Sequence, residues 1–345
     1  MKIKDFLGVE LPIIQAPMAG VQNSTLTVAV SLAGGLGSLP CAMLSTEQLR
    51  AELTTIRLQT DKPFNINFFC HTSPVPNADR ESKWQTVLKP YFTEYGISAT
   101  DITPGPSREP FSHAVADVLE EYRPDIVSFH FGLPATDLLA RVKGWGTTVL
   151  ASATTIKEAQ WLESHGADGI IAQGLEAGGH RGMFLSDDIS NQVGTFALLP
   201  QIIQKVKVPV IAAGGIVDAV GVKAALSLGA SAVQVGTAYL LCTETNTSQI
   251  HRAAIKSEDA QHTAITNLFS GRPARGIVNR VIREIGPINN DTPEFPLAAT
   301  AITALRKQAE QGGSGDFSPL WCGQNASGCK EISAAELTRG LAADL

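Results

Sequence analysis

VPVIAAGGIVDAVGVKAALSLGASAVQVG, residues 208–236, contains two β-rich runs separated by one helical pattern. The first run, Pro209–Ala213, is continuously apolar, which is typical of a parallel strand buried on both faces. The helical pattern spans Asp218–Leu228, and the glycine just past its end is favoured in a loop that leads from a helix into a strand. The second run is Ala232–Val235. The segment therefore predicts a strand, a helix and a second, parallel strand.

The same strand-then-helix order extends back to the start of the chain. Helical patterns such as Thr154–His165 and Thr195–Val206 lie between further β-rich runs. These runs are Pro12–Ala16, Leu36–Leu39, Phe64–Phe69, Asp125–His130, Thr147–Ala151 and Gly169–Ala172. Eight strands in this order predict an α/β protein, and they favour a closed (β/α)8 TIM barrel over an open doubly wound sheet.

The β-rich rhythm ends near residue 241. The helical patterns beyond it are Ser248–Glu258, Ala274–Ile285, Ala298–Gln311 and Ser333–Ala343. We therefore expect residues 1–241 to form the barrel and residues 242–320 to form a smaller helical cap over its mouth. The last helix, within residues 321–345, is expected to pack back on the barrel.

Two connections in the predicted barrel are long. One follows the third strand, from Cys70 to Tyr122, and includes the Pro-rich pieces His71–Pro76 and Thr103–Pro106. The other follows the sixth strand and contains residues 174–182. Loops that follow barrel strands lie on the face where active sites form, so we expect the chemistry there.

Composition argues against several functional classes. The 345 residues are 44% hydrophobic and 17% charged, so the chain can bury a large core. Its formal net charge of −6 argues against nucleic acid as a partner. The five cysteines form no Cys-x-x-Cys pair, which predicts no metal site and suits a reducing cytoplasm. Because no cysteine lies between Cys70 and Cys242, the late loops lack the thiol nucleophile of a purine-nucleotide dehydrogenase.

One uncharged segment, Leu11–Thr46, is long enough to span a membrane. Prolines at 12, 17 and 40 and the Ala33-Gly-Gly-Leu-Gly37 stretch interrupt it repeatedly. Buried strands joined by an apolar helix explain it better than a membrane span. The first ten residues also lack the apolar stretch of a signal peptide, so we expect a cytoplasmic protein.

Two glycine loops follow the last two predicted strands. Ala213-Gly-Gly-Ile216 follows the seventh strand, and Gln234-Val-Gly-Thr237 follows the eighth. Free backbone N–H groups beside helix N-termini bind anions, and these are the loops where barrels usually bind phosphate. Tight packing at barrel corners also requires glycine. The two loops in consecutive order favour a phosphate site, with Gly214, Gly215, Gln234, Val235, Gly236 and Thr237 as its candidate residues.

Two histidines are candidates for proton transfer. His180 lies in GLEAGGHRG, residues 174–182, where Gly178 and Gly179 allow positive φ and a close approach of a flat ligand. An imidazole there could exchange a proton near neutral pH, although a solvated histidine in a surface turn is the alternative. His130 ends the fourth strand. Both histidines fall on the carboxyl face of the predicted barrel, where they could share one site.

Three further side chains close predicted strands. Met18 could lie along a planar ring, and Asn67 and Gln173 could form hydrogen bonds with the edge of a heterocycle. The alternative is structural, because methionine fills gaps in cores and polar residues are common at strand ends. Neither a G-x-G-x-x-G fingerprint nor a P-loop is present in the chain.

Together these motifs resemble the nitronate monooxygenases, formerly called 2-nitropropane dioxygenases. The residues that carry the resemblance are Gln15–Gly20, Asn67, Ser128–Gly132, Gly174–Gly182, Ala213–Ile216 and Gln234–Thr237. The likeness covers most of residues 1–240 and weakens through the expected cap. The Glu-Ala-Gly-Gly-His core alone is also shared with flavin-dependent enoyl reductases and some quinone reductases.

The resemblance implies FMN, bound without a covalent link. It places Gly215 and Gln234–Thr237 at the phosphate, and Met18, Asn67, Gln173 and Gly178 at the ring and ribityl chain. It makes His180 the catalytic base or the group that faces the nitro oxygens, with His130 in support. The implied activity is oxidation of alkyl nitronates, such as propionate 3-nitronate, by FMN and O2 to an aldehyde and nitrite or nitrate. This activity would detoxify nitro compounds, and we expect a monomer or homodimer.

Two alternatives stay open at this point. One is an NAD(P)H-dependent flavin reductase that acts on enoyl thioesters or quinones. The other is a phosphate-binding barrel without redox chemistry. The arginines at 272, 275, 280 and 283 could attract an acidic substrate, but a solvated helix face is the favoured interpretation.

Overall fold

Eight parallel strands form one closed barrel in the computed structural model, which describes residues 3–98, 102 and 108–345. The strands are β1 (Ile13–Gln15), β2 (Gly37–Pro40), β3 (Phe64–Phe69), β4 (Ile126–His130), β5 (Thr148–Ala153), β6 (Gly169–Gln173), β8 (Val210–Ala213) and β9 (Ala232–Val235). Their order is β1-β9-β8-β6-β5-β4-β3-β2. A parallel bridge between Ile14 and Leu36 joins the first and last strands of this order. The predicted (β/α)8 barrel is confirmed.

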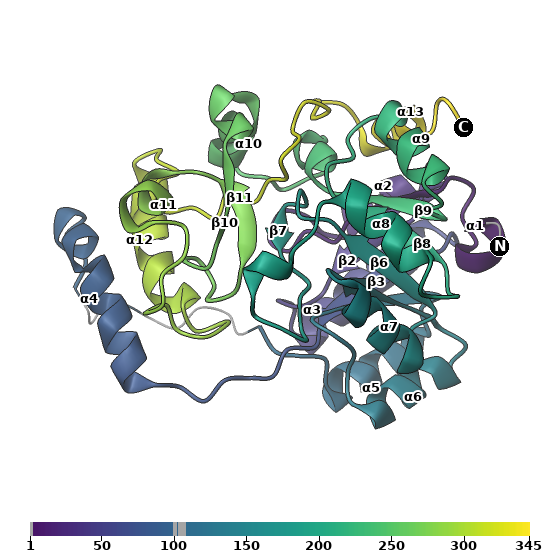
Figure 1. Cartoon of the computed structure of the whole chain (residues 1–345), viewed down its shortest axis with the longest axis horizontal. Coiled ribbons are helices and arrows are strands. Elements are labelled where there is room, and N and C mark those ends of the chain that lie inside the picture. The colour runs from purple at the N-terminus through teal and green to yellow at the C-terminus, as the bar shows by residue number, and fades with distance from the viewer. Residues whose placement is uncertain (1–2, 99–101, 103–107) are drawn as a thin grey trace.

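Helices surround the barrel. They are α2 (Ser24–Leu32), α3 (Thr46–Gln59), α5 (His113–Tyr122), α6 (Thr136–Gly144), α7 (Ile156–Ser164), α8 (Thr195–Ile203) and α9 (Ala219–Ser227). The short α1 (Ile3–Leu7) lies near the N-terminus, and α13 (Ala334–Leu341) packs against α2 and α9 near the C-terminus (Figure 1).

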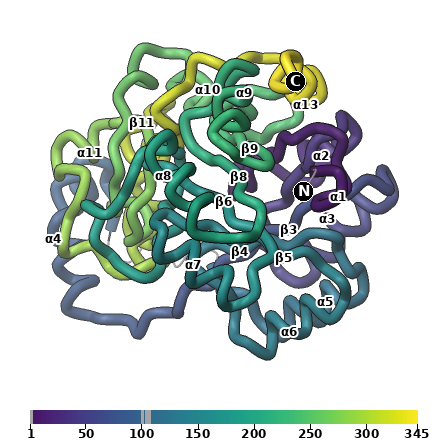
Figure 2. Tube along the Cα trace, turned by 45° about the vertical axis from the view of Figure 1, so that its right-hand side comes forward, coloured from purple at the N-terminus to yellow at the C-terminus, as the bar shows by residue number. Residues whose placement is uncertain are grey.

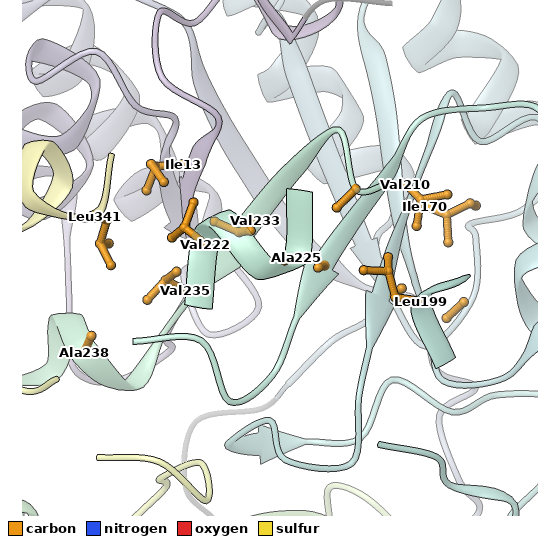
Figure 3. Close-up of a cluster of buried hydrophobic side chains, with 14 of the residues drawn as sticks. Ile13, Ile170, Leu199, Val210, Val222, Ala225, Val233, Val235, Ala238 and Leu341 are labelled. Atoms are coloured by element: carbon orange, nitrogen blue, oxygen red, sulfur yellow. The ribbon is translucent and has the colours of Figure 1, made fainter. Parts of the chain in front are cut away.

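Both faces of the barrel strands are buried, which explains their continuous apolar runs. One set of side chains packs outward against the helices, and Figure 3 shows Ile170 and Val210 beside Leu199 in this layer. Alternate residues, such as Ile171 and Ile211, form a second cluster that fills the barrel interior.

A second structural layer lies beside the carboxyl ends of the barrel strands (Figure 1, Figure 2). Its antiparallel sheet has the order β10-β11-β7, from Thr263–Thr266, Ala274–Ile277 and Gly179–His180. Its helices are α4 (Ala78–Glu94), α10 (Gln249–Lys256), α11 (Arg280–Ile285) and α12 (Ala299–Gln311). Because α4 packs against α12, part of the long connection after β3 joins this layer.

The helix expected over Ala274–Ile285 is wrong in its first half. Residues 274–277 form β11, the central strand of the second sheet, in which Arg275 pairs with Gly179. Helix α11 begins only at Arg280. Pairing with two distant strands overrides the local helical pattern here. The second layer is therefore a sheet with helices, and its proposed boundaries at 242 and 320 remain a prediction.

The Pro-rich piece Thr103–Pro106 lies outside the described residues. Among the helices of the described ranges, none has the length and apolar character needed to cross a bilayer.

Candidate active site

A cavity of about 310 Å³ opens at the carboxyl ends of the barrel strands, and residues of the second layer also line it. The predicted site residues found in its lining are Met18, Asn67, His130, Gln173, Gly178, Gly179, His180, Gly214, Gly215, Gln234, Gly236 and Thr237. Val235 does not line it, because its side chain is buried in the barrel wall and its carbonyl accepts from Ala16 N at 2.8 Å. The structure thus brings the strand-end motifs to one cavity.

The two glycine loops follow the neighbouring strands β8 and β9, and both line this cavity. Gly214 has φ 123° and Gly215 has φ 73°, so both adopt backbone conformations that favour glycine. Thr237 begins a short 3-10 helix after Gly236. Gln234 lines the same cavity, and its buried Oε1 accepts no hydrogen bond from the described residues. A buried acceptor without a donor is costly, so this part of the lining fits a ligand that carries a hydroxyl or N–H donor.

We call residues 174–182 the histidine loop. Its two neighbouring glycines, Gly178 and Gly179, are required for different reasons. Gly179 has φ 73° in open space, so its backbone conformation alone explains the residue. A Cβ at Gly178 would lie 2.6 Å from the backbone of Cys322 and Gly323. Close approach of another chain segment, and not of a flat ligand, therefore explains Gly178.

Two amide side chains at the strand ends are engaged by the protein itself. Asn67 Nδ2 donates to Ser128 Oγ at 2.9 Å. Gln173 Nε2 donates to the carbonyl of His180 at 2.9 Å, while its Oε1 accepts from Gly182 N at 2.7 Å. Gln173 thus bridges the His180 carbonyl and the Gly182 amide on either side of Arg181, and its carboxamide oxygen is occupied.

The imidazole of His180 lies in an aromatic environment. Its ring centroid is 5.4 Å from that of Phe295 and 5.5 Å from that of Trp321, and Nε2 lies 2.9 Å from Ser270 Oγ. Burial lowers the pKa of His180 well below its usual value, and the positive charges of Arg108 and Arg272 add to this effect. The ring is therefore neutral at pH 7, which suits a proton acceptor.

His130 contacts the backbone of His180. Its Nε2 lies 3.1 Å from the carbonyl oxygen of His180, and because a carbonyl only accepts, His130 carries its proton on Nε2. Burial lowers the pKa of His130 to about 4, although the bond to His180 partly opposes this shift. A Cβ at Gly182 would lie 3.0 Å from the His130 ring, which explains that glycine. His130 and Gln173 together fix the backbone of His180.

A buried arginine closes the histidine loop. Arg181 is 0% exposed, and its guanidinium donates to the carbonyls of Gly174 at 2.7 Å and Gln173 at 2.8 Å, and to Gln192 Oε1 at 2.9 Å. Its planar set of donors matches these three acceptors. Arg181 follows His180 directly in the motif, which is the one sequence signal that could have indicated it.

The second layer contributes residues that the sequence patterns missed. Ser270, Phe295 and Trp321 contact His180 from segments about 90 to 140 residues further along the chain. None of them stands in a motif beside the histidine, so no local signal marked them.

Two of the four arginines, Arg272 and Arg275, do not lie on a solvated helix face. Arg272 lies with its guanidinium carbon 4.1 Å from the Phe131 ring centroid and donates to the Met183 carbonyl at 2.7 Å. Arg275 is 4% exposed and donates to the Leu175 carbonyl at 3.0 Å. Arg280 fits the earlier interpretation better, because it pairs with glutamates on the surface. The interpretation is wrong for Arg275, which is buried in β11, and for Arg272, which is half-buried against Phe131.

The fold and the cavity define the class: this chain is a (β/α)8-barrel enzyme with its site at the carboxyl ends of the strands. More specifically, it belongs to the nitronate monooxygenase family, whose model, described as Nitronate monooxygenase, matches residues 1–344. The resemblance inferred from the motifs is confirmed, and the chain is an oxidoreductase.

Relatives and solved structures agree with this assignment. A nitronate monooxygenase of Pseudomonas aeruginosa is 43% identical over 98% of this chain and 97% of its own length. One from Paraburkholderia phytofirmans is 42% identical over 98% and 93%. The structure of a nitroalkane oxidase from Streptomyces ansochromogenes has a TM-score of 0.89 and 36% identity over 99% and 97% of the two chains. FabK from Thermotoga maritima is less similar, with a TM-score of 0.73 and 28% identity over 98% and 94%.

Proposed function

We propose that this protein oxidises alkyl nitronates, with propionate 3-nitronate as the expected substrate, using FMN and O2 and releasing an aldehyde with nitrite or nitrate. The observation that carries the proposal is a neutral His180 in the same cavity as two glycine loops. A base and an anion site in one cavity suit a cofactor with a phosphate and a substrate with an acidic C–H bond.

The residues of the cavity fit FMN. Gly214, Gly215, Gly236 and Thr237 would hold the phosphate, because their loops follow the neighbouring strands β8 and β9 and both line the cavity. Gln234 would accept a hydrogen bond at its buried Oε1 from a hydroxyl of the ribityl chain, because the phosphate of FMN supplies no donor at neutral pH. Met18 and Asn67 also line the cavity and would meet the flavin ring. When bound, FMN supplies the redox centre between the nitronate and O2.

The role of His180 depends on the form in which the substrate arrives. For a neutral nitroalkane, the unprotonated ring nitrogen would remove the α-proton. The Ser270 hydroxyl can donate to the Arg272 carbonyl at 3.3 Å and accept from His180 Nε2, which leaves the Nδ1 lone pair free. A preformed nitronate needs no base. Because the pKa of His180 is lowered, an imidazolium that stabilises the nitronate charge is disfavoured.

Detoxification of nitro compounds in the cytoplasm is part of the proposal. All five cysteines are free, as expected for a reducing compartment.

Oxygen uptake tests the proposed function. FMN-loaded protein mixed with propionate 3-nitronate is expected to consume O2 and release nitrite or nitrate. A parallel anaerobic mixture with NADH is expected to keep its yellow colour. Absence of O2 uptake with the nitronate would overturn the proposal, and rapid bleaching by NADH would favour the flavin-reductase alternative.

A further inference from the structure

A C-terminal segment contacts both glycine loops and lines the same cavity. We call residues 321–329 the C-terminal strap. It starts beside the second sheet, where Trp321 forms a bridge with Gly276, and then reaches the barrel loops. Gly323 N donates to Thr237 Oγ1 at 3.0 Å, and Asn325 Nδ2 donates to the Gly215 carbonyl at 3.3 Å. The strap therefore contacts both glycine loops.

The strap also packs backbone to backbone against the histidine loop. Gln324 N donates to the Glu176 carbonyl at 2.9 Å. A Cβ at Gly323 would lie 2.8 Å from this same carbonyl oxygen, and a Cβ at Gly178 would lie 2.6 Å from Gly323 N. These distances are too short for any side chain, so the contact depends on glycine in both segments.

The carboxamide of Asn325 has a fixed orientation. Its Oδ1 accepts from Ser327 N at 3.1 Å and from Ser327 Oγ at 2.7 Å. This leaves Nδ2 to face the Gly215 carbonyl. Because Gly215 has a left-handed φ of 73°, a bond to its carbonyl restricts the orientation of the peptide that follows it.

We propose that the C-terminal strap completes the phosphate end of the cofactor site, with Asn325 as a positioning residue for the Gly215 loop. The inference rests on the proposed use of FMN and extends it to a part of the chain far from the glycine motifs. The strap acts through the loops that meet the phosphate, so it should distinguish FMN from riboflavin, which has the same ring without the phosphate.

Flavin titration of the apo-protein tests this inference. The variants are Asn325→Ala, Asn325→Asp and the matched control Gln324→Ala, whose exposed side chain is removed while its backbone N–H remains. Binding of FMN and of riboflavin is followed by quenching of flavin fluorescence. We expect Asn325→Ala to raise the Kd for FMN by about tenfold, the loss of one hydrogen bond, with riboflavin changed by less than about twofold. Asn325→Asp should weaken the binding of FMN further, because it places a carboxylate beside the loop that would hold the phosphate. The control should bind both flavins like the parent protein.

Equal losses for FMN and riboflavin, or no change for FMN, would overturn the inference. A second measurement uses the parent protein alone, so it does not depend on the folding of a variant. Hydrogen exchange of residues 321–329 should slow on binding FMN and change little on binding riboflavin; equal protection by both would also contradict the proposal. If FMN binds as expected but no nitronate is oxidised, the proposed function fails while the strap assignment stands. A parent protein that binds no FMN overturns both.

Discussion

The charge state of His180 is set by what surrounds its ring. Burial is the largest cause of its lowered pKa, and nearby cations contribute further. A base must be unprotonated to work, so activity that depends on His180 is lost as the pH falls through its pKa. Because the lowered pKa keeps the ring neutral at lower pH, His180 can act as a base over a wider pH range.

Removing one of these cations should shift the pH profile of the enzyme. In Arg272→Met, a positive charge beside His180 is lost, so the pKa of His180 should rise. We expect the acidic limb of kcat/KM for a nitroalkane to move to higher pH, measured over the range in which the protein stays folded. The charge-matched control is Arg280→Met on the surface helix α11, which should leave the limb in place. An acidic limb that does not move in Arg272→Met would show that this cation has no such role.

At the scale of elements, the barrel strands could be predicted because the pattern that identifies them is local. Strands buried on both faces must be apolar at nearly every position, and the helices between them carry their own start and end signals. Strand β11 could not be predicted in this way. Its sequence, Ala-Arg-Gly-Ile, has little β preference, and its pairing with β7 and β10 depends on the tertiary fold.

In the candidate site, too, residues in local motifs could be predicted and the others could not. The histidines and glycine loops stand in motifs at strand ends, and the barrel topology brings strand ends together. Ser270, Trp321 and Asn325 come from the second layer and the strap, where no periodic pattern fixes position. Sequence patterns also misjudged the reason for Gly178, because its close neighbour is the C-terminal strap.

The two glycines of the histidine loop should respond differently to alanine. Gly178→Ala forces a methyl group against strap backbone at 2.6 Å, so we expect a loss of roughly 2–3 kcal/mol in the free energy of unfolding. Gly179→Ala meets no atom within 4 Å and carries only the strain of a φ of 73°, about 1 kcal/mol. Urea denaturation of the two apo-proteins measures both. A larger loss for Gly179→Ala would contradict the packing of the strap on this loop.

For the whole molecule, buried histidines predict sensitivity to acid. Burial lowers the pKa values of His71, His130 and His251 to about 4 from the usual 6.5. In this range the unfolded chain binds protons that the folded protein does not, so stability is full above pH 6.5 and falls as the pH drops toward 4. Each histidine contributes roughly 1.4 kcal/mol per pH unit within that range.

Urea denaturation at a series of pH values measures this slope. The slope is proportional to the number of protons taken up on unfolding, and His251→Asn should reduce that number by about one. The same substitution at the exposed His262 serves as the control and should leave it unchanged. If the slope in His251→Asn equals that of the parent, His251 does not contribute to the pH dependence of the free energy of unfolding.

In the proposed function His180 is a neutral base in a nitronate-oxidising site, and one substitution tests this role. His180→Asn is assayed for kcat/KM by oxygen uptake with a nitroalkane and with the corresponding preformed nitronate. We predict a loss of about 10²- to 10⁴-fold on the nitroalkane, which needs proton removal, and less than about tenfold on the nitronate, which does not. Equal losses on the two substrates would show that His180 does not act as the base that removes the α-proton.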